Sequence, residues 1–84
     1  MKKWKSHKTV EAARIEEVQM HHPGPELPAE AVLVLADGER VTVSRQYLAK
    51  HQPEAGGYFV RYEDGYESFS PATSFERGYT PVED

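Results

Sequence analysis

The chain has 84 residues, a formal net charge of −4 at pH 7 and no cysteine. This length predicts a single domain with a small core, and the lack of cysteine excludes a disulfide framework and thiolate chemistry. The acidic balance argues against a dedicated nucleic-acid binder, which usually carries a basic face, and no apolar run approaches the ~20 residues that span a bilayer.

Basic residues gather at the start of the chain. They are Lys2, Lys3, Lys5 and Lys8. We interpret residues 1–7 as a solvated basic N-terminal arm that keeps the neighbouring strand soluble, and a phosphate contact is the alternative. No hydrophobic segment follows the arm, so we do not expect a signal peptide. The next segment, residues 8–16, mixes helix-favouring Glu and Ala with strand-favouring Thr, Val and Ile, and we expect a strand there.

The proline-rich part of the chain spans residues 19–30 and contains Pro23, Pro25 and Pro28. Because proline lacks a backbone N–H, this segment can form neither a helix nor a central strand, and we expect a mobile surface loop. The adjacent His21 and His22 have no cysteine or helical i, i+4 partner, so they are a weak metal signal. We expect no metal and no cofactor.

Residues 31–44 predict a β-hairpin that turns at Asp37-Gly38. A two-residue Asp-Gly loop favours a type I′ turn, which would place Val34 opposite Val41. This register gathers the valines on one face, namely Val32, Val34, Val41 and Val43. Leu33 and Leu35 then lie on the other face, where another strand, a helix or a partner protein would cover them.

A short helix is expected over residues 44–51. Ser44 is a suitable N-cap, Tyr47 and Leu48 would face inward, and Gln52-Pro53 would end the helix.

A second hairpin is expected over residues 58–69, with Asp64-Gly65 as its two-residue loop. That loop places Val60 opposite Phe69. One face, which we expect to be the core face, carries Tyr58, Val60, Tyr62 and Phe69. The other face, which we expect to be mostly wet, carries Phe59, Arg61, Tyr66 and Ser68.

A second short helix follows this hairpin. Ser70 would be its N-cap, Pro71 would lie in its first turn and Gly78 would follow its last residue. Phe75 would point into the core and Tyr79 would fold back over the helix end. These elements together predict a small α+β domain over residues 1–84, with two short helices and an antiparallel sheet of about five strands, open or closed into a barrel.

Four segments of the chain resemble a family of small proteins of tailed bacteriophages and prophages. They are Thr9–Ala12, Tyr47–Pro53, Gly56–Pro71 and Phe75–Thr80. The shared pattern is Val-Glu-Ala early and Gly-Gly-Tyr, Asp-Gly-Tyr, Ser-Pro, Phe-Glu and Gly-Tyr-Thr late. The resemblance implies a phage product that works in the cytoplasm of a bacterial host or in a virion. It implies no activity and no catalytic residue.

The sequence contains no phosphate loop, no nucleophile with a base in context and no metal-ligand spacing, so we do not expect an enzyme. Its aromatic residues exceed what so small a core can hide, and tyrosine is enriched at protein interfaces. We therefore predict a partner surface made of Phe59, Arg61, Tyr66, Leu33 and Leu35. The expected function is a non-catalytic phage accessory protein that binds a host protein. The alternatives are a small structural virion component and, third, a nucleic-acid binder.

Overall fold

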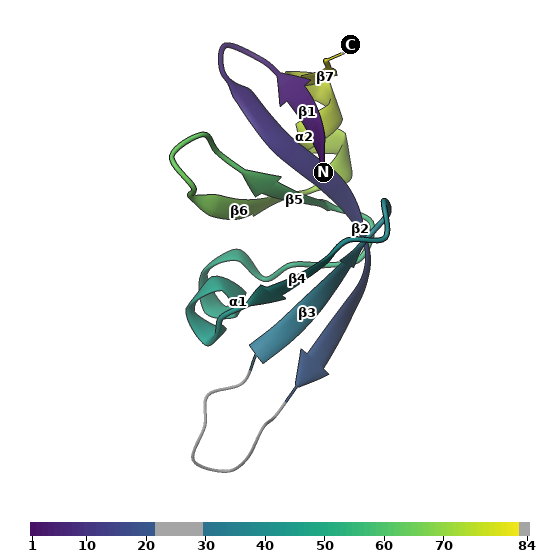
Figure 1. The fold of residues 1–84 in the computed structure, drawn as a ribbon, viewed down its shortest axis with the longest axis vertical. Coiled ribbons are helices and arrows are strands. Elements are labelled where there is room, and N and C mark those ends of the chain that lie inside the picture. The colour runs from purple at the N-terminus through teal and green to yellow at the C-terminus, as the bar shows by residue number, and fades with distance from the viewer. Residues whose placement is uncertain (22–29, 83–84) are drawn as a thin grey trace.

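The computed structural model describes residues 1–21 and 30–82. Figure 1 shows an open, strongly bent antiparallel sheet with one short helix packed against each half. The elements are β1 (Lys2–Lys5), β2 (Thr9–His21), β3 (Glu30–Leu35), β4 (Arg40–Val43), α1 (Arg45–His51), β5 (Tyr58–Arg61), β6 (Glu67–Ser70), α2 (Ala72–Gly78) and β7 (Thr80–Pro81). The α+β class is confirmed. The sheet has seven strands and is not closed into a barrel.

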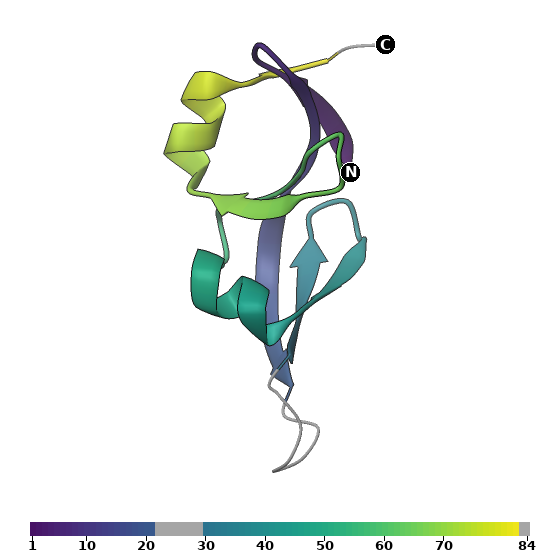
Figure 2. The ribbon, with the colours of Figure 1, turned by 90° about the vertical axis from the view of Figure 1, so that its left-hand side faces the viewer.

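The long strand β2 organises the molecule. Its first half pairs with β1 on one edge and with β5 on the other, and its second half pairs with β3. The β2–β3 register shifts between Ile15 and Glu17, and such a bulge bends a strand and increases its twist. In Figure 2 the same strand runs from the upper half of the molecule into the lower half. β2 therefore contributes side chains to both halves.

Two hydrophobic cores lie on opposite faces of the β2–β5 ribbon. The core beside α1 consists of Ala13, Ile15, Ala31, Leu33, Leu35, Val41, Val43, Tyr47 and Phe59. The core beside α2 consists of Val10, Ala12, Tyr58, Val60 and Phe75. Because successive side chains of a strand point to opposite faces, β5 sends Phe59 into the first core and its neighbours into the second. β5 is buried on both faces, which is why it lacks the expected alternation of dry and wet positions.

The turn of the β3–β4 hairpin contains three residues, not two. The Gly38 N–H donates to the Leu35 carbonyl, the Leu35 N–H donates to the Glu39 carbonyl, and Gly38 has a φ of +88°. This is a type I turn followed by a left-handed glycine. Leu33 consequently pairs with Val41, so the predicted valine register is wrong by one residue.

The consequence is that strand β3 exchanges its inner and outer faces relative to the prediction, while Val41 and Val43 of β4 lie in the core. A one-residue slip moves every side chain of a strand to the other face. Leu33 and Leu35 lie in the core with at most 1% of their surface exposed, while Val32 and Val34 lie half-buried on the outer face. The Arg40 guanidinium reaches over this outer face to Gln19 on β2, 2.7 Å away.

The β5–β6 hairpin departs from its predicted register in the same way. The Gly65 N–H donates to the Tyr62 carbonyl, the Tyr62 N–H donates to the Tyr66 carbonyl, and Gly65 has a φ of +91°. Phe59 therefore pairs with Phe69, and Val60 does not. Phe59 is fully buried, so the prediction of a wet face at this position is wrong.

The predicted N-terminal arm is also wrong, because Lys2–Lys5 form strand β1. Trp4 packs between Tyr58 and Phe75, with ring centroids 5.6 and 5.0 Å away. The Met1 amine lies 3.0 Å from Asp37 Oδ2 in the β3–β4 turn. Pairing with β2 and the partial burial of Trp4 hold this lysine-rich segment in the sheet, while its lysines project into solvent.

The strand predicted over residues 8–16 is confirmed and extends further, to His21. The predicted loop over residues 19–30 is therefore wrong at its two ends, because residues 19–21 belong to β2 and Glu30 begins β3. Its central residues, 22–29, lie outside the described part of the chain.

The first helix is confirmed as predicted. The Ser44 hydroxyl accepts a hydrogen bond from the Tyr47 N–H at 3.1 Å, and Gln52 ends the helix in a left-handed conformation. In the second helix Phe75 is buried and Tyr79 stacks on it at 4.6 Å, as expected.

The predicted caps of the second helix are wrong. Pro71, not Ser70, occupies the N-cap position, and no side chain caps this end. Gly78 is the last residue of the helix and does not follow it. Each helix has seven residues, and in residues 1–21 and 30–82 no helix is long and apolar enough to cross a membrane.

Candidate interaction surface around Tyr66

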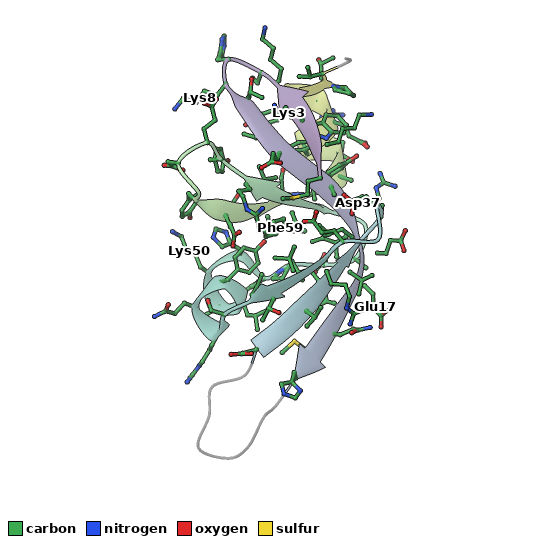
Figure 3. All side chains as sticks on the ribbon, viewed as in Figure 1. Lys3, Lys8, Glu17, Asp37, Lys50 and Phe59 are labelled. Atoms are coloured by element: carbon green, nitrogen blue, oxygen red, sulfur yellow. The ribbon has the colours of Figure 1, made fainter. Side chains whose placement is uncertain are left out.

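The structure separates the five residues that the sequence predicted as one partner surface. Leu33, Leu35 and Phe59 have at most 1% of their surface exposed. The prediction is wrong for these three, because a side chain inside the core cannot contact a partner. Figure 3 shows Phe59 directed toward the space between the two halves of the sheet. Only Arg61 and Tyr66 remain accessible.

Arg61 is engaged within the sheet. Its Nη2 lies 2.9 Å from Glu67 Oε2, and its guanidinium lies 5.6 Å from the centroid of the Phe59 ring. Across the sheet, Lys3 pairs with Glu11, Glu11 with Arg61, and Arg61 with Glu67. Opposite charges on neighbouring strands support pairing, so we assign Arg61 to the sheet rather than to recognition.

Tyr66 is the most accessible aromatic side chain in the described part of the chain, with 45% of its surface exposed. The β5–β6 turn fixes its position. Asp64 Oδ1 accepts a hydrogen bond from the Tyr66 N–H at 2.9 Å, and the left-handed Gly65 directs the chain back toward β6. A large aromatic ring is thus held on a short, well-defined turn.

Three neighbours surround the Tyr66 ring, and together with it they form what we call the Tyr66 surface: Lys50, His51, Tyr62 and Tyr66. The Lys50 ammonium lies 5.1 Å from the ring centroid of Tyr66, within the range of a cation–π contact. The Tyr62 ring lies 5.9 Å away at an angle of 40°. The hydroxyl of Tyr66 is 3.3 Å from His51 Nε2.

The electrostatics of His51 favour its neutral form. Burial lowers the pKa of His51, and the nearby Lys50 ammonium lowers it further. The imidazole also packs on Tyr47, with ring centroids 4.8 Å apart. At neutral pH the surface therefore offers one cation, a neutral imidazole and two phenol rings.

An open hollow of about 460 Å³ borders the Tyr66 surface. It separates the tip of the β1–β2 hairpin from the tip of the β5–β6 hairpin, and its lining residues are Lys8, Thr9, Tyr62, Glu63, Asp64 and Tyr66. Figure 3 places Lys8 and Lys50 on either side of the β5–β6 tip. The hollow has a basic wall and an acidic wall with tyrosine between them, an arrangement suited to a partner that carries both polar and aromatic groups.

Sequence reasoning missed Lys50, His51 and Tyr62 as parts of this surface. The sequence placed Lys50 and His51 only within the helix over residues 44–51, and Tyr62 on the core face of its hairpin. Their contact with Tyr66 joins α1 to a turn 15 residues away, and no local pattern encodes that contact.

Comparisons with protein-family models, with curated proteins and with solved structures find no match to this chain. Within residues 1–21 and 30–82, no three His, Cys, Asp or Glu side chains gather as a candidate metal site.

Proposed function

We propose that this protein is a non-catalytic interaction module that binds a partner protein through the Tyr66 surface. The observation that carries the proposal is the exposed Tyr66 ring, framed by Lys50, His51 and Tyr62 next to an open hollow. Aromatic side chains that are rigid and only partly covered in the free protein are typical anchors of protein interfaces. Met20 is the other large hydrophobic residue so exposed in the described part of the chain.

The partner we propose is a bacterial host protein, bound in the host cytoplasm by a phage accessory protein. This part of the proposal is supported by the sequence resemblance to small phage and prophage proteins. A virion component needs assembly surfaces, which a solvent-facing Leu33 and Leu35 and a free basic arm would have provided. Leu33 and Leu35 are buried and the arm is a strand, so that alternative keeps only the resemblance as support. The nucleic-acid alternative relied on the segment Lys2–Lys8 together with the aromatic residues, and the net charge of −4 argues against it.

A pull-down with matched variants tests the proposal. A C-terminally tagged protein would be expressed in a bacterial host and its bound proteins quantified for the wild type, Tyr66→Ala and Thr42→Ala. We expect Tyr66→Ala to lose a host protein that the wild type and Thr42→Ala retain, with an affinity loss of about 2 kcal/mol or more for the purified pair. Thr42 is exposed on β4 and is not part of the Tyr66 surface.

Retention of the same partners by Tyr66→Ala would contradict the assignment of the binding surface. Mass spectrometry of purified phage particles addresses the virion alternative. Stoichiometric presence in particles would replace the accessory function with a structural one.

A further inference from the structure

Three strands of the sheet, β4, β6 and β7, are each paired with only one neighbouring strand. An exposed terminal strand can pair with another chain unless it is covered or interrupted. β6 lies against α1, and the Tyr47 hydroxyl donates to the Ser68 carbonyl at 2.7 Å. β7 consists of two residues, of which Pro81 has no N–H to donate. Two of the three ends are therefore protected.

The remaining end, β4, presents an open edge. The Leu35 N–H donates to the Glu39 carbonyl, so the backbone of Glu39 faces β3. Because the direction alternates along an antiparallel strand, the backbone groups of Arg40 and Thr42 point away from β3. No proline or bulge interrupts β4, and the Arg40 side chain reaches sideways to Gln19 without shielding this edge.

We propose that β4 pairs with β4 of a second copy of this chain, in an antiparallel, two-fold symmetric contact centred on Thr42. Each Thr42 N–H would donate to the Thr42 carbonyl of the other copy, and the N–H of Ser44 to the carbonyl of Arg40. The pairing is self-complementary, since it places threonine opposite threonine and arginine opposite serine with no like charges facing each other.

Charge beyond the end of β4 also favours a second copy over an unrelated strand. In this register Arg45 comes opposite Glu39 of the other copy, in the β3–β4 turn that also carries Asp37. Asp37 and Glu39 share the single Met1 amine, so the turn keeps a net negative charge. Arg45 forms no ion pair among the described side chains, and it borders an open hollow of about 540 Å³.

Sedimentation velocity, measured on the full chain over a range of concentrations, tests the proposal. We expect a concentration-dependent dimer for the wild type and a monomer for Thr42→Pro, which removes only the N–H that faces away from β3. The matched control Thr42→Val keeps that N–H and is expected to stay dimeric. A wild type that remains monomeric up to about 1 mM would overturn the proposal.

If Thr42→Pro does not fold, exchanging the charges of Arg45 and Glu39 provides a second test. We expect Arg45→Glu to weaken the dimer about tenfold, because the charge pair occurs twice by symmetry, and the double variant Arg45→Glu with Glu39→Arg to restore it. A dimer unaffected by both Thr42→Pro and Arg45→Glu uses another surface and also overturns the proposal. Amide exchange gives a local readout, since Thr42 N–H protection should rise with protein concentration.

Discussion

The two hairpins have the same type of turn but differ in how their strands are buried. Both reverse direction through three residues that end in a left-handed glycine, Gly38 in β3–β4 and Gly65 in β5–β6. In β3 buried and half-buried residues alternate, whereas β5 is buried at Tyr58, Phe59 and Val60 in succession. The same local geometry therefore serves a strand with one dry face and a strand with two.

This difference shows where the stability of the domain is concentrated. A strand with one dry face contributes alternate side chains to the core, and each of its outer positions can change at low cost. A strand between two cores has no such spare positions. Substitutions in β5 should accordingly be more harmful than substitutions on the outer face of β3.

The largest expected effect is that of Phe59→Ala. Phe59 is fully buried, and removal of its ring leaves a cavity between α1, β3 and β5. We expect the free energy of unfolding to fall by about 3–5 kcal/mol, which is a large part of the stability of a small domain. Urea denaturation against Val32→Ala, on the half-buried outer face, measures the contrast, since that control should lose about 1 kcal/mol. Equal losses would contradict the distinction between the hairpins.

A smaller loss is expected for Gly57→Ala, just before β5. A methyl group at Gly57 would overlap Cε1 of the Phe69 ring, so the ring or the backbone must move. We expect a loss of about 1–3 kcal/mol. Gly78→Ala is the matched control, because a methyl group there meets nothing within 4 Å and alanine favours the helix. Thermal melting measures the stability of both variants. A Gly57→Ala variant as stable as Gly78→Ala would contradict the predicted clash with Phe69.

Gly38→Ala and Gly65→Ala sharpen the comparison from the opposite direction. The two turns have the same backbone form, with φ values of +88° and +91°, and open space around each glycine. Alanine in this conformation costs about 1–2 kcal/mol, so we expect similar losses in both hairpins despite their different burial. Denaturation midpoints that differ widely between the two variants would mean that the surrounding core, and not the turn, sets the cost.

The smallest expected effect concerns pH. The backbone N–H of Glu39 and the nearby Met1 amine lower the pKa of Asp37 below its ordinary value of 3.8. A lowered pKa in the folded state stabilises the fold above pH 3.8, and this contribution disappears as the pH falls through the lower value. We expect Asp37→Asn to be less stable than the wild type at pH 7 and equally stable in strong acid. Asp64→Asn is the control, because the Met1 amine contacts Asp37 and not Asp64. A deficit of Asp37→Asn that persists at low pH would point to geometry rather than charge.

The sequence predicted features that depend on local chemistry. The capping serine of α1, the proline after its end and the inward Phe75 of α2 were all readable from neighbouring residues. The α+β class followed from the same signals. By contrast, strand β1 depends on pairing with β2 and on the packing of Trp4 against Phe75. Its lysines favoured the prediction of a solvated arm.

The register of both hairpins was missed for one physical reason. An Asp-Gly pair fits a two-residue turn, and it equally fits the last two positions of a three-residue turn with a left-handed glycine. The row of valines favoured the first choice, although the second gathers larger side chains, Leu33 and Leu35, with Val41 and Val43. That greater apolar volume was the available signal. The Tyr66 surface joins α1 to a distant turn, so no sequence pattern could assemble it.

Strand β2 has a kinetic consequence. Its thirteen residues line both cores, so neither half can come apart without exposing part of the other. Heat or denaturant should therefore melt the molecule in a single cooperative step, with no half-folded species. Its partners β1 and β3 adjoin it in the chain, whereas β5 lies far downstream. The pairing of β2 with β5, which lies between the two cores, is therefore the non-local step that we expect to limit the folding rate.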